Sequence, residues 1–570
     1  MPAAVEGFVA VPSRRPLRIF AFDPMLGRAA RNRITVDIAN ERLKPGPIGS
    51  RVHVIDYDPV TRLRYPAVDL DDPRILMQAG LEPAESNPLF HQQMVYAVTM
   101  RVIENFERAL GRRWTFSGGR PLRIYPHAVQ EPNAFYDDRL QALLFGYFKA
   151  DGHDVGANLP GQVVFTCLSQ DIVAHEATHA MVDRLRPYLM EPSNPDVLAF
   201  HEGFADIVAI LQHFSFPEVL AEQLAQARGE VSDAGPLVTL AAQFGYATGR
   251  GGALRSAVDM EGPDAPTYAN TFEPHARGAL LVAAVFDAFF STYQRRVLDL
   301  LRIATGGTGV LPRGALHPDL VARLADEAAT TARNVLMMCI RATELLPPVD
   351  VTFGDYLRAL VTADLEVVPD DPLEQRNALI EGFRRRGIHP HGVGSLAAEA
   401  LRWPTRTIHE PIAAMDIQRR LLELANAYQP GARRVKREDI AKEARGLHAY
   451  AERHREELDL DPDVPVKVAG FHVSQGWSRD GRFIAAAIIQ FVQTMPARTD
   501  RQGGGTRRRR GGTTIVAGPD GRIRYLISKP LRTADPDAME RSMPERRATA
   551  DTDARPSATG SLARLHRGLL

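Results

Sequence analysis

The sequence predicts an α+β fold, in which strands and helices occupy separate stretches of the chain instead of alternating. Short β-like runs separated by proline-rich turns fill residues 1–85. Helical periodicity dominates from residue 171 to about residue 390. Strand-like segments with Asp-Gly turn signals return between residues 466 and 531.

The length of the chain, 570 residues, is sufficient for two to four domains. Changes in pattern along the chain place the expected boundaries. We expect, in order, an N-terminal β-rich region (1–85), strands and helices that end in a conspicuous helix (86–185), a mostly helical segment (186–400), an extension of helices followed by strands (401–532) and a disordered tail (533–570). The tail is polar and contains proline, a composition that buries too little apolar surface to fold.

The first half of the chain shows both kinds of local pattern. Arg18–Phe22 and Val52–Ile55 are short β-like runs. Between Pro88 and Gly111, apolar residues recur at helical spacing. Residues 112–165 read as strands and loops, and Asp171–Leu185 has helical periodicity.

The C-terminal third is predicted to contain two helices and then hairpins. The helical segments lie near residues 411–428 and 437–456, and the hairpin turns at Asp480-Gly481 and Asp520-Gly521. A glycine-rich stretch between the hairpins contains Arg507–Arg510. This run could contact phosphate or an acidic surface. Because it lacks interleaved aromatic residues, we interpret it as a solvated, flexible loop.

Composition excludes several classes of protein. Lys+Arg and Asp+Glu number 69 each, so nucleic acid is not an expected partner. The two cysteines suggest no disulfide framework. The N-terminus has no basic segment followed by an apolar one, so we expect a cytoplasmic location, with export by a route without a signal peptide left open. No apolar run is long enough to predict a membrane span.

The stretch His175-Glu176-Ala177-Thr178-His179 has the pattern H-E-x-x-H on the predicted helix. Residues four apart lie on one helix face, so the two imidazoles can bind one zinc ion. Glu176 is next to a ligand and can take a proton from water. The alternative is a charged helix face that binds nothing.

A zinc hydrolase needs a third protein ligand and an open fourth position. Val182 and Leu185 stand where a downstream Gly and His ligand would be, which excludes that version. Glu202 can serve instead, with Asp206 on the same face to accept the free N–H of a ligand histidine. His201 is a rival ligand, but it points about 100° away from Glu202 on a helix, and we interpret it as a surface or pocket histidine.

Five further segments occur in the order seen in the thermolysin-like zinc endopeptidases, the glutamate-ligand branch of the zincins. The chain resembles this family over roughly Pro88 to Phe290. The segments are Asp171 four positions before the first ligand, Asn133–Tyr136, the strand-like run Leu143–Phe148, Leu254–Ser256, and Pro274–Gly278 before an apolar helix, Ala279–Phe290.

The resemblance implies a zincin-like two-lobe metallopeptidase fold, with a β-rich N-lobe and a mostly helical C-lobe. It also implies one Zn²⁺ and a peptide or protein substrate. The implied roles are metal ligands for His175, His179 and Glu202; outer partners for Asp171 and Asp206; general base for Glu176; oxyanion stabilisation for His275 with Arg255, which also binds the substrate backbone; and substrate-strand binding for Asn133 and Ala134.

The sequence also departs from the family pattern. His275 is one residue closer to Gly278 than usual, and Met190 stands where a tyrosine is expected, with Tyr188 and Tyr268 as nearby candidates. Residues 211–214 replace an acidic run, so calcium is not supported.

The expected function is zinc-dependent peptide hydrolysis. One alternative is a weakened relative that binds zinc and peptides or a partner without efficient cleavage. Another is an interaction protein that acts through the C-terminal β region and its arginines.

Overall fold

The computed structural model divides into two compact units. Unit 1 comprises Met1–Glu104, Thr115–Ala177 and Leu562–Leu570, and unit 2 comprises Asn105–Trp114 and Thr178–Ser561. The structure describes residues 12–21, 24, 32–116, 119–150, 161–226, 267–311, 315–406, 408–413, 416–426, 437–499, 506–531 and 566. Two continuous helices, α2 (Pro88–Leu110) and α3 (Gln170–Leu185), each belong partly to both units.

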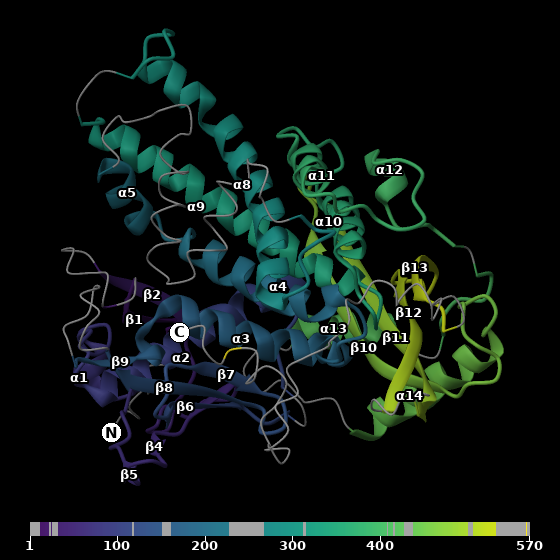
Figure 1. Cartoon of the computed structure of the whole chain (residues 1–570), viewed down its shortest axis with the longest axis horizontal. Coiled ribbons are helices and arrows are strands. Elements are labelled where there is room, and N and C mark those ends of the chain that lie inside the picture. Colours follow the sequence, from purple (N-terminus) through teal and green to yellow (C-terminus); the bar gives the residue numbers. More distant parts are fainter. Residues whose placement is uncertain are drawn as a thin grey trace, which may run out of the picture. The chain divides into compact units, whose positions relative to one another are not determined.

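Unit 1 contains a mixed sheet, whose strands appear in Figure 1 in the purple and blue of the early sequence. Its strand order is β3-β6-β8-β7, and β9 also pairs with β8. Strand β7 pairs only with β8 in this order, so it is an edge strand. The bounds are β3 Val52–Val54, β6 Leu122–Val129, β7 Ala134–Asp137, β8 Ala142–Lys149 and β9 Val163–Phe165.

Smaller elements complete unit 1. An antiparallel ribbon alternates buried and exposed residues, as a strand with one covered face should. The elements are the ribbon β1 (Arg14–Phe20) and β2 (Arg33–Ala39), the short pair β4 (Tyr57–Asp58) and β5 (Leu63–Arg64), and helix α1 (Pro73–Leu76). The β-rich character expected of the N-terminal region is therefore present.

Unit 2 begins with a group of helices, of which α8 and α9 are the longest and lie side by side (Figure 1). By length and composition α8 could cross a membrane, although the sequence was expected to contain no such run. However, 78% of the apolar 18-residue stretch of α8 is buried, as in the core helix of a soluble protein. The helices are α4 Pro195–His213, α5 Pro217–Gln226, α8 Pro274–Ala304, α9 Pro318–Ala342, α10 Phe353–Val367, α11 Gln375–Arg385 and α12 Ala398–Leu401.

A four-stranded antiparallel meander, β10-β11-β12-β13, forms the C-terminal part of unit 2. Both Asp-Gly turns occur as predicted, and Gly481 and Gly521 have φ of 80° and 77°, which favours glycine. Helix α14 packs on β10, and the sheet shares an apolar cluster with it. The bounds are α13 Ile417–Asn426, α14 Arg437–Arg453, β10 Val466–Trp477, β11 Phe483–Thr499, β12 Thr506–Ala517 and β13 Ile523–Lys529.

The prediction that Arg507–Arg510 forms a flexible loop is wrong, because these residues lie in β12 and pair with β11. Arg510 donates two hydrogen bonds of 2.6 Å to the Glu191 carboxylate, and its guanidinium lies 4.6 Å from the Tyr188 ring centroid. The sequence signal failed because glycine is depleted in strands and a run of charges suggests a solvated segment, whereas pairing with β11 decides the structure here. At least Arg510 is therefore a structural side chain.

The meander also supports the end of helix α3. Gln490 Nε2 donates to the carbonyl of Leu185, the last residue of α3, at 3.3 Å. The next residue, Arg186, is fully buried, and its guanidinium donates to Thr514 Oγ1 of β12 and to the carbonyls of Thr343 and Glu344. Because Gln490 satisfies the last carbonyl of α3 and Arg186 bonds to β12 directly after the helix, the C-terminal sheet helps to fix where α3 ends.

Candidate metal centre

Helix α3 positions the H-E-x-x-H motif in a buried setting. Small and apolar residues such as Ala174, Ala177 and Met181 are fully buried on it, so tertiary packing stabilises the helix. Asp171 lies in the first turn, where the negative charge of its carboxylate interacts favourably with the positive end of the helix dipole. His175 and His179 follow one turn apart, and both are buried.

The structure contains a buried, histidine-rich group that could hold a metal ion. His175, His179, Glu202 and His566 each offer one ligand atom, and these atoms lie within 4.8 Å of one another. Two of its members, His175 and His179, lie on helix α3. Imidazole nitrogens with one carboxylate oxygen form a donor set typical of zinc.

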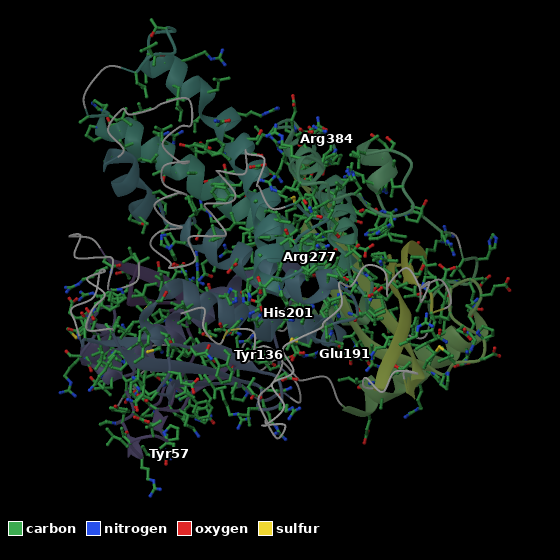
Figure 2. The ribbon with its side chains drawn as sticks, in the orientation of Figure 1. Tyr57, Tyr136, Glu191, His201, Arg277 and Arg384 are labelled. Atoms are coloured by element: carbon green, nitrogen blue, oxygen red, sulfur yellow. The ribbon has the colours of Figure 1, made fainter. Side chains whose placement is uncertain are left out.

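In unit 2, Glu202 of α4 lies beside His179. The distance from His179 Nε2 to Glu202 Oε2 is 3.7 Å. His179 Nδ1 lies 2.8 Å from His201 Nδ1, so one ring donates to the other and the orientation of His179 is fixed. His201 is fully buried on α4, and the surface location considered for it is wrong. It is labelled in Figure 2, and Asp206 lies one turn after Glu202.

Two glycines bring helices α4 and α8 together near Glu202. A Cβ on Gly278 would lie 2.9 Å from both the Ala199 carbonyl oxygen and the Gly203 backbone nitrogen. A Cβ on Gly203 would lie 2.7 Å from the Gly278 carbonyl oxygen. Only glycine allows the two backbones to approach so closely. Glu202 precedes one of these glycines and His275 stands three residues before the other.

Helix α8 begins earlier than predicted, at Pro274, so His275 lies in its first turn. Its Nε2 is 3.3 Å from Glu202 Oε2, and its Nδ1 is 3.0 Å from Oε1 of Glu273, the residue that caps α8. Burial alone would lower the pKa of His275, but the hydrogen bonds to the two carboxylates raise it to about 9. His275 is thus a hydrogen-bond donor that contacts a candidate metal ligand.

In unit 1, the edge strand β7 contacts Glu176. The backbone N–H of Tyr136 donates to Glu176 Oε2 at 3.0 Å, and Figure 2 labels this tyrosine. The other oxygen, Oε1, lies 3.3 Å from Nδ1 of His566. The same Nδ1 lies 3.0 Å from the Ala134 carbonyl oxygen, and the ring of His566 lies 5.6 Å from that of His175 between centroids.

Asn133, immediately before β7, uses its backbone within the sheet. Its carbonyl oxygen accepts from the Gly146 N–H at 2.8 Å. Its side-chain Oδ1 is buried and has no hydrogen-bond partner among the residues that the structure describes. A buried amide oxygen without a partner is costly, and a bound ligand could satisfy it.

Arg255, Tyr268 and Tyr188 were also considered for roles at the site. Arg255 falls outside the described residues. Tyr268 donates its hydroxyl hydrogen to Asp196, and the guanidinium of Arg277, labelled in Figure 2, lies 3.9 Å from its ring centroid. Tyr188 contacts Arg510 and accepts from Lys467 Nζ at 3.3 Å. Both tyrosines therefore have contacts within unit 2 that hold their rings.

His566 is the member of the group that the sequence patterns did not identify. It lies in the tail expected to be disordered, yet its side chain is only 5% exposed. The one available signal is compositional, because leucines return at positions 562, 565, 569 and 570 after a long polar stretch. A single histidine in such a segment has no second ligand at a fixed spacing, so no motif identifies it as a metal ligand.

No protein-family model matches the chain, and no curated protein matches it. Among solved structures, the precursor of protealysin, a metalloproteinase from Serratia proteamaculans, is similar with a TM-score of 0.34 and 14% sequence identity. The match covers 61% of this chain and 90% of that chain. This is a distant resemblance to a metallopeptidase.

Proposed function

We propose that this chain is a zinc-dependent peptidase that hydrolyses peptide bonds. The observation that carries the proposal is the buried group of His175, His179 and Glu202 around a helix that also carries Glu176. The donor set fits zinc, since two imidazoles and one carboxylate are the ligands of many zinc hydrolases. Under this proposal, the β-rich unit 1 and the largely helical unit 2 correspond to the two lobes of a zincin-like fold.

Each residue then has a defined task. Zinc bound here would polarise the scissile carbonyl and lower the pKa of water towards about 7. Glu176 would take the proton of the attacking water and return it to the leaving amine. The Tyr136 N–H holds Glu176 Oε2, and Oε1, which lies 3.3 Å from His566 Nδ1, would accept the proton once His566 leaves. The histidine at 275 would donate a hydrogen bond to the developing oxyanion.

The edge strand β7 would hold the substrate. An edge strand has backbone groups that can pair with an extended peptide. The Ala134 carbonyl is one such group, and the unpaired Asn133 Oδ1 is a nearby acceptor. Asp171 and Asp206 would support the ligand histidines from the outside, and Arg255 would contact the substrate backbone.

The position of His566 favours a second candidate function. Catalytic zinc sites keep one position open for water, whereas sites with four protein ligands are typically structural. His566 would supply the fourth ligand, and it also contacts Glu176 and the Ala134 carbonyl. A chain that keeps this arrangement would bind zinc without cleaving peptides, so hydrolysis requires His566 to leave.

Two variants test the proposal, and the second separates the candidates. Glu176→Gln should retain zinc and fold but should not hydrolyse a mixed peptide library, because an amide cannot accept the proton. His566→Ala should hydrolyse the same library faster than the wild type. If His566→Ala retains zinc but cleaves nothing, the second candidate is the better account.

A further inference from the structure

A second buried group of metal-ligating side chains lies entirely within unit 1. His91 belongs to α2, His127 to β6, and Cys167 to the short 3₁₀ helix Thr166–Leu168 that precedes α3. One ligand atom from each lies within 4.8 Å of the others, and all three side chains are buried. None of these residues takes part in the peptidase chemistry proposed above.

The outward-facing nitrogens of the two imidazoles both meet acceptors. His127 Nδ1 lies 2.7 Å from Oδ1 of Asp56, and His91 Nε2 lies 2.8 Å from the carbonyl oxygen of Glu85. Each of these nitrogens must therefore carry a hydrogen to donate. Histidine ligands of metals typically donate their second N–H to a carboxylate or a backbone carbonyl in this way.

The inward-facing nitrogens then point lone pairs at each other. His91 Nδ1 and His127 Nε2 are 2.9 Å apart. If both rings are neutral, neither of these nitrogens has a hydrogen, and two bare lone pairs at this distance repel. A third particle between them removes the conflict, either a proton or a metal ion. Two nitrogens on one tetrahedral zinc would be about 3.3 Å apart, close to the distance observed.

The third member of the group favours a metal ion over a shared proton. The Cys167 side chain is buried, and its ligand atom lies within 4.8 Å of those of both imidazoles. A shared proton needs no third ligand, whereas a metal ion can bind two imidazoles and a thiolate, and a coordinating thiol is deprotonated outright. A divalent ion would balance the charges of the Cys167 thiolate and the Asp56 carboxylate.

We propose that His91, His127 and Cys167 form a second metal site, which binds a soft or borderline transition-metal ion of the zinc and copper class. Thiolate with two imidazoles is a donor set that these ions prefer over magnesium or calcium. The site links α2, β6 and the segment that leads into α3. Its role is structural, since the three ligands are buried and aromatic rings such as Phe165 pack against the imidazoles.

Cobalt(II) provides a test that needs no enzymatic activity. The full chain would be produced in cobalt-supplemented medium, and its near-ultraviolet spectrum recorded for thiolate-to-cobalt charge transfer. The histidine-rich group around α3 contains no sulfur, so it cannot give this band. We expect the band in the wild type, its loss in Cys167→Ser, and its retention in His179→Ala. Metal analysis should find two ions per chain in the wild type and one in each of these two variants.

Cys339 provides the matched control, since it is also buried and is the only other cysteine. The band should persist in Cys339→Ser, where Cys167 is the one remaining thiol. This variant keeps the test decisive even if Cys167→Ser fails to fold. Absence of the band from both the wild type and Cys339→Ser overturns the proposal, as does a band that survives in folded Cys167→Ser. Metal analysis of protein from unsupplemented medium then distinguishes zinc from copper.

Discussion

Gly203 and Gly278 meet where helices α4 and α8 pack, and a Cβ on either would lie within 3 Å of the other's backbone. This contact sets the distance between Glu202 and His275, whose side chains are 3.3 Å apart. The small residues are therefore part of the candidate metal centre, although they offer no ligand atoms.

Replacing Gly278 with alanine should destabilise unit 2 and disturb the centre. Overpacking of this kind typically costs about 1–3 kcal/mol, and we expect weaker zinc retention because Glu202 moves with α4. Denaturant unfolding and zinc analysis would measure both effects. Gly394→Ala is the control, since nothing lies within 4 Å of its added Cβ. Equal stability and zinc content in the two variants would show that the close approach is unimportant.

Replacing His275 with alanine should lower the turnover rate by about 10²–10³ if the residue donates to the oxyanion. Zinc content and peptide affinity should stay nearly unchanged, because His275 is not a ligand in this account. Turnover would be measured in the His566→Ala background, where the site is accessible. A variant that instead loses zinc with unchanged turnover per bound zinc would make His275 a positioning residue for Glu202.

Replacing His566 with alanine should expose Glu176 and the fourth position at the metal. We expect faster peptide cleavage, and also faster removal of zinc by a chelator, since one donor is lost. The exposed His391 provides the control variant, His391→Ala, which should match the wild type in both assays. Unchanged chelation and unchanged cleavage in His566→Ala would mean that this side chain does not block the site in solution.

Glu344 joins the helical part of unit 2 to the C-terminal sheet and should make stability depend on pH. Its carboxylate accepts from Arg112 at 3.1 Å and lies 2.8 Å from Nε2 of His472 on β10. Burial alone would raise the pKa of Glu344, but the His472 hydrogen bond and the charge of Arg112 hold it well below its usual value. The stabilisation is therefore present at neutral pH and is lost as the pH falls below about 4, the value for an unfolded glutamate.

Glu344→Gln should lower the free energy of unfolding by about 3 kcal/mol at pH 7, because it removes the buried negative charge that pairs with Arg112. The free energies of unfolding of Glu344→Gln and the wild type should approach each other by about 1.4 kcal/mol for each pH unit below about 4. Denaturant unfolding at pH 7 and pH 3 would measure this change, with the exposed Glu399→Gln as a control. A difference that does not vary with pH would contradict the proposed ion pairing.

The sequence predicted those parts of the structure that rest on local patterns. Helix α3, helix α2 and both Asp-Gly hairpins follow from periodicity and turn residues, and the structure confirms them. The spacing of the motif likewise predicted that His175 and His179 would share a helix face, since four residues complete about one turn.

Long-range contacts could not be predicted in the same way. His566 reaches the Ala134 carbonyl from 432 residues away in sequence, and no periodic pattern encodes such a contact. The pairing of His91 with His127 joins a helix to a strand and depends on the sheet register. The role of Arg510 was not predicted because its partner Glu191 is 319 residues away in sequence. Local composition therefore does not predict which distant residue a side chain will contact.

The zinc content of His179→Ala compared with that of the wild type tests the central claim most directly. His179 is fully buried, and its Nε2 lies 3.7 Å from Glu202 Oε2. We predict that this variant contains one zinc fewer per chain, while His448→Ala, which changes a half-exposed histidine on α14, keeps the wild-type content. Equal zinc in His179→Ala and the wild type would contradict the metal centre and, with it, the proposed peptidase.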